Sequence, residues 1–260
     1  MVDMSSLFEG FKFKRKNTII HNLDPRSKAI YLFITFASAL IFVEPIPLLI
    51  ILSTSIPLIV LAKSLREWSK SMRGLLLFIA FIFILNLLST PVNRVNYAAS
   101  MVLRFLALTS AFSVFFLTTT PDDFMAALEK LGLPKEYTLM FTMSIRFVPT
   151  LARDLQIIID AQKSRGLELE KGNFIQRVKN YVPILIPLII YEIRRSIMIA
   201  EALEARAFGA SKKTTPYIVL KFSLWDYVFS AIVLLFFSLL ISMKLLNMLP
   251  PWMNIKLPDF

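Results

Sequence analysis

The chain has 260 residues, of which 56% are apolar and 18% are charged, and its mean hydropathy is +0.65. Ordinary soluble domains are about 45–50% apolar, so this composition favours a membrane protein with several spans and a sizeable polar segment. The sequence has no Cys and one His, which excludes zinc fingers, redox motifs and thiol catalysis.

The net charge is +11, which in a soluble protein would suggest nucleic-acid binding. Here the basic residues lie largely between and beyond apolar runs, as in cytoplasmic loops near anionic lipid. We therefore expect the lipid bilayer as a partner, and no nucleic acid.

Five apolar runs predict transmembrane helices. They are residues 29–43, 48–62, 74–88, 97–118 and 227–243. Pro45 and Pro47 predict a tight turn between the first two runs, because proline disfavours helix in the preceding residue. Runs of about 15 residues reach only about 22 Å, so the first two need flanking residues, and the number of crossings stays open by about one. No cleavable signal peptide is expected, since the N-terminal segment lacks an apolar core.

The basic residues of the short loops predict the orientation. The segment before the first run and the loop after the second are rich in Lys and Arg, whereas the loops after the first and third runs carry only Arg94. This alternation predicts a cytoplasmic N-terminus and, after five spans, an external C-terminus. The basic residues are Lys12, Lys14, Arg15, Lys16, Arg26 and Lys28 in the first segment, and Lys63, Arg66, Lys70 and Arg73 in the loop.

A polar stretch of about a hundred residues before the last run predicts a helical domain on the cytoplasmic side. Thr120, Pro121 and the two Asp residues that follow predict the start of its first helix, because Thr caps, Pro suits the first turn and acids favour the positive helix end. Gly132 predicts the end of that helix.

Two longer helices are expected in the same domain. One begins at Lys135, has a break or kink at Pro149 and ends at Gly166. The other begins in an apolar cluster at 181–191 that is too short to cross a bilayer, so it predicts an interfacial or buried helix. This helix is expected to continue to Gly209.

Both long helices place an arginine near their C-terminal end, between small residues. A cation is favoured at the negative end of a helix, and small neighbours leave the guanidinium open to a bidentate contact with a partner's carboxylate. One such arginine is ordinary capping, but two of them predict two docking points on one cytoplasmic surface. The candidate docking residues are Ser164, Arg165, Gly166, Ala205, Arg206 and Ala207.

Several short motifs occur in a characteristic order. They are HNLDPRSK at 21–28, TTTPDDF at 118–124, RFVP at 146–149, AQKSRG at 161–166 and EAR at 204–206. With these motifs the chain resembles, over nearly its whole length, the T component of energy-coupling factor (ECF) transporters. This is the transmembrane coupling subunit, in a family that includes the membrane subunit of cobalt and nickel importers.

The resemblance implies a fold, partners and a location. The fold is an all-α polytopic membrane protein of about five transmembrane helices with an inserted cytoplasmic coupling domain. Residues 1–118 hold the first four spans, 119–224 the coupling helices, and 225–260 the final span and tail. The implied partners are two ABC-type ATPase subunits at the cytoplasmic face and a separate substrate-binding membrane (S) subunit, for uptake of a vitamin or a transition-metal ion. The location is a prokaryotic cell membrane.

The resemblance also assigns roles to the two arginines. Arg165 is the contact for one ATPase subunit and Arg206 is the contact for the other. The family's common form of the motif is Ala-Arg-Gly, whereas this chain has Ala207 after the second arginine. We therefore expect the end of that helix to move to Gly209.

The chain is not expected to be an enzyme or to hold a cofactor or a metal. It has no phosphate-binding loop and no catalytic constellation. A membrane-bound enzyme would require clustered His, Asp or Glu at the interface. The alternative function is a self-contained secondary transporter or channel, which would require ionisable residues along several spans, and only Arg104 is charged within the bulk of a predicted span.

Three single positions have structural interpretations. His21 is expected in capping or loop packing, because one His forms no metal cluster. The turn at Asp24 is expected to place basic residues such as Arg26 on lipid headgroups. Arg104 is expected to snorkel or to make a polar contact within the bundle.

Overall fold

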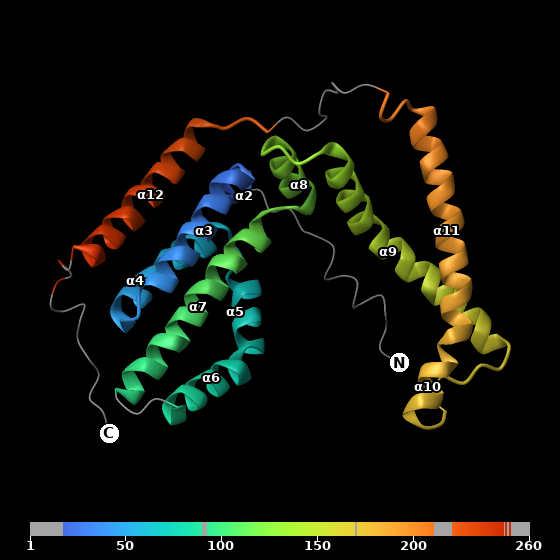
Figure 1. The fold of residues 1–260 in the computed structure, drawn as a ribbon, viewed down its shortest axis with the longest axis horizontal. Helices are drawn as coiled ribbons and strands as arrows, with labels where there is room; N and C mark the ends of the chain where they lie inside the picture. The colour runs from blue at the N-terminus through green and yellow to red at the C-terminus, as the bar shows by residue number, and fades with distance from the viewer. Residues whose placement is uncertain are drawn as a thin grey trace. The chain divides into compact units, whose positions relative to one another are not determined.

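The computed structural model describes residues 18–89, 93–169, 171–210, 220–246, 248 and 250 of the protein. These residues form helices joined by turns and loops, and no strand occurs among them, so the predicted all-α class is confirmed (Figure 1). The chain divides into two compact units. The bundle unit comprises Lys14–Leu133 and Leu220–Phe260, and the inserted unit contains Pro134–Val219.

In the bundle unit each of the five apolar runs forms a helix. These helices are α3 (Pro25–Ile41), α4 (Pro45–Leu61), α6 (Leu76–Ser89), α7 (Arg94–Thr118) and α12 (Leu224–Leu245). The smaller helices of the unit are α2 (Ile19–Asn22), α5 (Leu65–Gly74) and α8 (Pro121–Lys130). α8 begins and ends as predicted: Thr120 Oγ1 accepts a hydrogen bond from the Asp123 N–H (3.0 Å), and Gly132 has a positive φ of 104°.

Two of the described helices, α7 and α12, are long and apolar enough to cross a membrane. A third span results if α5 and α6, which meet at a bend of 50°, are counted as one. α4 is a shorter apolar helix. The protein therefore has two to three candidate membrane spans by length and composition.

α7 lies at the centre of the bundle unit, where it packs against α3, α4 and α6, while α12 packs against α3. Tyr31 of α3 joins three helices: its hydroxyl lies 2.8 Å from Ser55 Oγ of α4, and its ring lies 6.4 Å from the rings of Phe229 and Phe237 of α12. Apolar side chains on the outer faces of these helices, such as Phe33 and Leu77, are exposed. This is the pattern of a bundle whose outer surface faces lipid rather than water.

Contacts at both ends of α3 and α12 show that these helices run parallel. At their N-terminal ends the Asp24 N–H donates to Asp226 Oδ1 (2.7 Å). At their C-terminal ends Lys244 forms an ion pair with Glu44. The first and last apolar helices of the bundle unit therefore point in the same direction.

Further contacts show that α7 runs antiparallel to α3. The Lys28 ammonium, near the start of α3, donates to the carbonyl of Thr118 at the end of α7 (2.9 Å). Arg104, in the first half of α7, donates through Nη2 to the carbonyl of Phe42 after α3 (2.7 Å). The predicted polar contact of Arg104 within the bundle is therefore confirmed.

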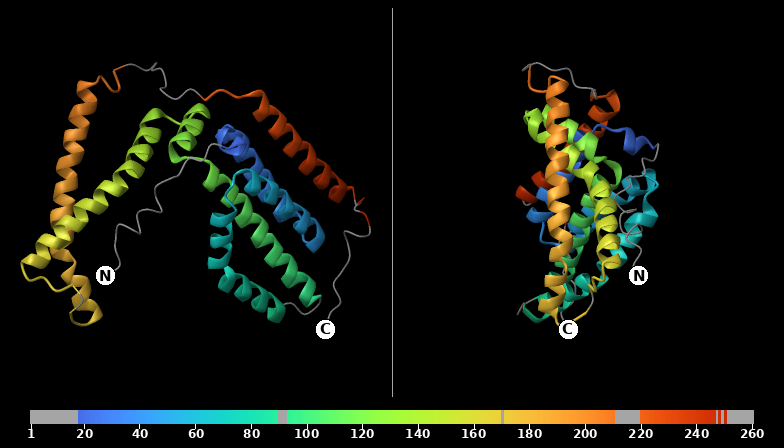
Figure 2. Two further views of the ribbon diagram at one scale, coloured as in Figure 1. Left: turned by 180° about the vertical axis from the view of Figure 1, so that it is seen from behind. Right: turned by 90° about the vertical axis from the view of Figure 1, so that its right-hand side faces the viewer.

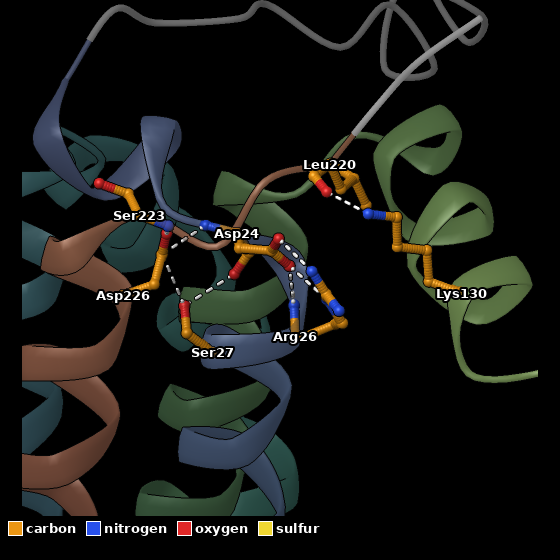
Figure 3. A network of polar contacts seen from close by, with 7 residues as sticks. All are labelled: Asp24, Arg26, Ser27, Lys130, Leu220, Ser223 and Asp226. Carbon is orange, nitrogen blue, oxygen red and sulfur yellow. Dashed lines mark hydrogen bonds and ion pairs between the residues drawn. The ribbon is translucent and has the colours of Figure 1, made fainter. Parts of the chain in front are cut away.

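One buried polar network joins the start of α3 to the start of α12 (Figure 3). Asp226 is 2% exposed, and its Oδ1 accepts from the Asp24 N–H (2.7 Å) and from Ser27 Oγ (3.2 Å), while its Oδ2 accepts from the Ser223 N–H (2.8 Å). Arg26 donates through Nε and Nη2 to the Asp24 carboxylate (3.0 and 2.9 Å). We call these five residues the Asp226 network.

The side chain of Arg26 is thus bound to protein, and its expected contact with lipid headgroups stays a prediction. Burial raises the pKa of Asp24, but the hydrogen bonds and charge of Arg26 outweigh burial and hold that pKa below its ordinary value. Beside this network, Lys130 at the end of α8 donates to the carbonyl of Leu220 (Figure 3). The chain therefore leaves and re-enters the bundle unit at the same end.

The inserted unit consists of α9 (Lys135–Ser164), α10 (Phe174–Asn180) and α11 (Val182–Ala205), with α11 packed against both others. α9 is continuous through Pro149, so the alternative of a break there is wrong, and α11 is continuous through Pro187. Asp154 and Arg195 form an ion pair (2.6 Å), and Gln162 Nε2 donates to the Pro183 carbonyl (3.1 Å). α9 and α11 therefore run antiparallel, as Figure 2 also shows.

Removing the Asp226 carboxylate should destabilise the bundle. Asp226→Ala leaves the Asp24 and Ser223 N–H groups without their acceptor, whereas the Ser27 hydroxyl keeps its bond to the Asp24 carbonyl (2.7 Å). Each donor left unpaired costs about 1–3 kcal/mol. Asp226→Asn keeps one acceptor oxygen and should cost less. The measurement is the apparent unfolding temperature of the detergent-purified protein. Lys244→Met, which removes a partly exposed pair at the other end, is the control and should cost less than about 1 kcal/mol. Equal shifts for all three variants would contradict the role given to this network.

Candidate functional site

Arg165 closes α9 as its C-terminal cap residue. Gly166 follows with a φ of +88°, and its N–H donates to the Lys163 carbonyl (2.9 Å). The Leu167 N–H donates to the Gln162 carbonyl (3.1 Å). These two bonds form a Schellman motif, in which a left-handed residue satisfies the last carbonyls of the helix. The predicted end of this helix at Gly166 is confirmed.

Arg206 closes α11 in the same way. Ala207 adopts a left-handed φ of +57°, the Ala207 N–H donates to the Glu204 carbonyl (2.8 Å), and the Phe208 N–H donates to the Leu203 carbonyl (3.0 Å). The expected shift of the helix end to Gly209 is therefore wrong, because α11 ends at Ala205. A left-handed alanine costs about 1–2 kcal/mol, and the two recovered hydrogen bonds offset this cost.

The two arginines thus occupy the same position in the same local structure. All six candidate residues are exposed. Within the described residues, neither the Arg165 nor the Arg206 guanidinium has an ion pair or a hydrogen bond. Arg195, in contrast, lies between the two helices and binds Asp154 and Glu192. Arg195 therefore has a structural role, whereas Arg165 and Arg206 are open to a partner at negative helix ends.

The two docking candidates lie at opposite ends of the antiparallel pair of α9 and α11 (Figure 1). The bond from Gln162 to Pro183 places Arg165 beside the start of α11. Arg206 lies about 23 residues beyond Pro183, or roughly 35 Å along a straight helix. The two arginines therefore lie on two separate surfaces of the inserted unit.

No group of three or more His, Asp or Glu side chains suited to a metal ion occurs in the described part of the chain. His21 is buried, and its Nδ1 lies 2.7 Å from Thr18 Oγ1, which confirms the predicted loop packing.

The structural roles of Lys28 and Asp226 were not predicted from the sequence. Lys28 is 3% exposed and donates to the carbonyls of His21 (3.3 Å) and Thr118 (2.9 Å). Each of the two charged residues lies directly before an apolar run of the sequence. A charge at this position is the signal from which a buried, paired side chain could have been predicted. Residues of the motif at 21–28 thus connect the start of α3 to the end of α7 and to the start of α12 by hydrogen bonds.

The fold and the composition define an all-helical membrane protein with a helical unit inserted before its last apolar helix. The chain belongs to the cobalt transport protein family (CbiQ), whose model matches residues 16–217. The resemblance inferred from the motifs is therefore confirmed, as is the expectation of a transport protein rather than an enzyme.

Three relatives are each named energy-coupling factor transporter transmembrane protein EcfT. The protein from Ruminiclostridium cellulolyticum is 31% identical over 88% of this chain and 94% of the relative. The protein from Streptococcus equi subsp. equi is 34% identical over 81% of this chain and 87% of the relative. The protein from Staphylococcus aureus is 28% identical, with coverages of 82% and 88%. The similarity therefore extends over most of each chain.

The left-handed conformation of Ala207 should make a glycine favourable there. Ala207→Gly removes the steric cost of that conformation and should stabilise the inserted unit by about 1 kcal/mol. Ala205→Gly, two residues earlier in regular helix, is the matched control and should destabilise by up to about 1 kcal/mol. Hydrogen exchange of the last turn of α11 measures both effects. Shifts of the same sign in the two variants would show that Ala207 is not left-handed in the protein.

Proposed function

We propose that this chain is the transmembrane energy-coupling subunit of an ATP-driven ECF-type importer. The observation that carries the proposal is the pair of exposed arginines at matching helix ends, within a unit inserted in a membrane bundle. Family membership supports it, because the relatives are named as the transmembrane protein of energy-coupling factor transporters. The same names weaken the alternative of a self-contained secondary transporter or channel.

The proposed partners follow from the two helix ends. One ABC-type ATPase subunit docks at Ser164, Arg165 and Gly166, and the second docks at Ala205, Arg206 and Ala207. Each guanidinium meets a carboxylate of its ATPase subunit, for which the planar fork of arginine is suited. The separation of roughly 35 Å along α11 supports one docking site for each subunit.

The proposed topology has five spans, formed by α3, α4, α6, α7 and α12, and α5 lies in the loop before the third span. The N-terminus and the coupling domain, residues 119–224, lie in the cytoplasm of a prokaryotic cell. Parallel α3 and α12, and the joining of Lys130 to Leu220 at the start of α3, support this arrangement, since both connections to the inserted unit leave from one end. α8 packs against α3 and therefore belongs to the bundle unit, although it lies within residues 119–224. The compact part of the coupling domain begins near Pro134, where the inserted unit begins.

In the proposed mechanism, closure of the two ATPase subunits on ATP displaces the two docked helix ends. The ion pair between Asp154 and Arg195 holds α9 and α11 together, so the displacement moves them as a pair. Exposed apolar residues along α11, including Ile186, Ile190 and Ile197, form a surface for the S subunit. That subunit then reorients and releases a vitamin or a transition-metal ion inward.

Co-purification with the ATPase pair from the same genome tests the docking sites. Arg165→Glu with Arg206→Glu reverses both charges and should abolish the complex, because a lost charge pair at an interface costs about 2–5 kcal/mol. Each single variant should retain one contact and weaken the complex. Arg153→Glu with Arg194→Glu makes the same charge change on exposed positions within α9 and α11, and it should leave the complex intact.

The result has three readings. Loss of the ATPase complex only in the Arg165→Glu and Arg206→Glu double variant, with normal gel-filtration behaviour in detergent, supports the two docking sites. Equal binding by all variants would reduce Arg165 and Arg206 to helix caps. Failure of the unaltered chain to bind its ATPase pair would contradict the proposed function itself.

A further inference from the structure

α5 has two chemically different sides. Trp68 packs against the core of the bundle, and its Nε1 donates to Ser110 Oγ of α7 (3.2 Å). On the opposite side Arg66, Lys70 and Arg73 lie within about 60° of one another around the helix axis, since an α-helix has 3.6 residues per turn. All three are exposed. We call them the α5 basic stripe.

The stripe has no structural role that the contacts reveal. Lys28 and Arg104, which hold the bundle together, each donate to a buried carbonyl. Among the described residues, the three side chains of the stripe form no ion pair and no hydrogen bond. The acidic residue of α5, Glu67, lies beside the stripe and not within it. Three exposed cations on one helix face form a positive patch that attracts an anionic partner.

The position of α5 identifies that partner. Leu75 alone separates α5 from α6, and the two helices meet at a bend of 50°. α6 contains no charged residue, and Leu76, Leu77 and Phe78 at its start are exposed. The stripe therefore stands at the junction between polar chain and lipid-facing helix. An amphipathic basic helix at such a junction lies at the depth of the phospholipid headgroups.

We propose that Arg66, Lys70 and Arg73 bind the headgroup phosphates of anionic phospholipids, and that α5 is a lipid-recognising element of this subunit. Basic residues near a membrane surface attract anionic lipids, and this attraction weakens in salt. Trp68 fixes the opposite side of α5 to α7, so the stripe is held in place toward the headgroups. The inference rests on the membrane location of the chain and is independent of the ATPase partners.

Trp68 itself provides the probe. The full chain with Trp225→Phe and Trp252→Phe keeps Trp68 as its single tryptophan. It is reconstituted in phosphatidylcholine vesicles that contain a minor fraction of either brominated phosphatidylglycerol or brominated phosphatidylcholine. Because bromine quenches tryptophan only at short range, quenching reports which lipid is enriched beside α5. We expect the phosphatidylglycerol to quench about threefold more than the phosphatidylcholine at low salt, and the excess to fall at about 0.5 M salt.

Two variants make the test specific. Arg66→Gln with Lys70→Gln and Arg73→Gln should abolish the excess quenching while Trp68 emission without bromine is unchanged. Arg153→Gln with Lys163→Gln and Arg194→Gln removes three exposed charges from the inserted unit and should keep the excess. Equal quenching by the two lipids, or loss of the excess in both variants, would overturn the proposal. Equal quenching together with loss of ATPase co-purification in the stripe variant would assign the stripe to a protein partner instead.

Discussion

The architecture of this subunit depends on a carboxylate that is buried at the start of its last apolar helix. Asp226 is taken out of water, and such a charge is tolerated only when donors replace its hydration. The donors come from Ser223 on its own chain segment and from Asp24 and Ser27 at the start of α3. Because the buried carboxylate needs these donors in place of water, the first and last apolar helices are held side by side and parallel.

Lys28 extends the same constraint to the centre of the bundle. Its ammonium is buried and donates to the carbonyl of Thr118, at the negative end of α7. α8 follows directly after α7, and its Lys130 reaches the carbonyl of Leu220. The points where the chain leaves and re-enters the bundle are thus attached to one polar framework. These contacts make both attachment points of the inserted unit part of the folded bundle.

Five arginines of the described chain fall into two groups that differ in burial and in contacts. Arg26, Arg104 and Arg195 each bind a carboxylate or a carbonyl and stabilise helix contacts. Arg165 and Arg206 end their helices without such partners among the described residues, next to Gly166 and Ala207 in left-handed conformations. The sharp turn after each of these two arginines satisfies the last carbonyls with backbone donors. The guanidinium is consequently not needed for capping and stays exposed at the helix end.

Much of this protein could be read from the order of its residues, because the signals are local. Apolar runs predicted the five bundle helices, Thr120 and Gly132 predicted the ends of α8, and the repeated arginine pattern predicted both docking candidates. Local signals failed at Pro149, where a break was one of the predicted outcomes but α9 is continuous. The other backbone hydrogen bonds of α9 and its packing against α11 outweigh the one hydrogen bond that proline removes. Local signals also failed at Ala207, where hydrogen bonds of a complete Schellman motif outweigh the preference for glycine.

Tertiary structure alone decided the partners of the charged residues. Asp24 and Asp226 are about two hundred residues apart in sequence, and no periodicity or spacing indicates that they meet. The side-by-side packing of α3 and α12 and the placement of Arg165 and Arg206 at opposite ends of a helix pair likewise depend on long-range packing. Sequence thus determined which segments are helical, which are apolar and which arginines end a helix, because those properties follow from neighbours within one or two turns. The fold determined which charges are buried and paired and which remain open for a partner, because desolvation depends on every element that packs around a side chain.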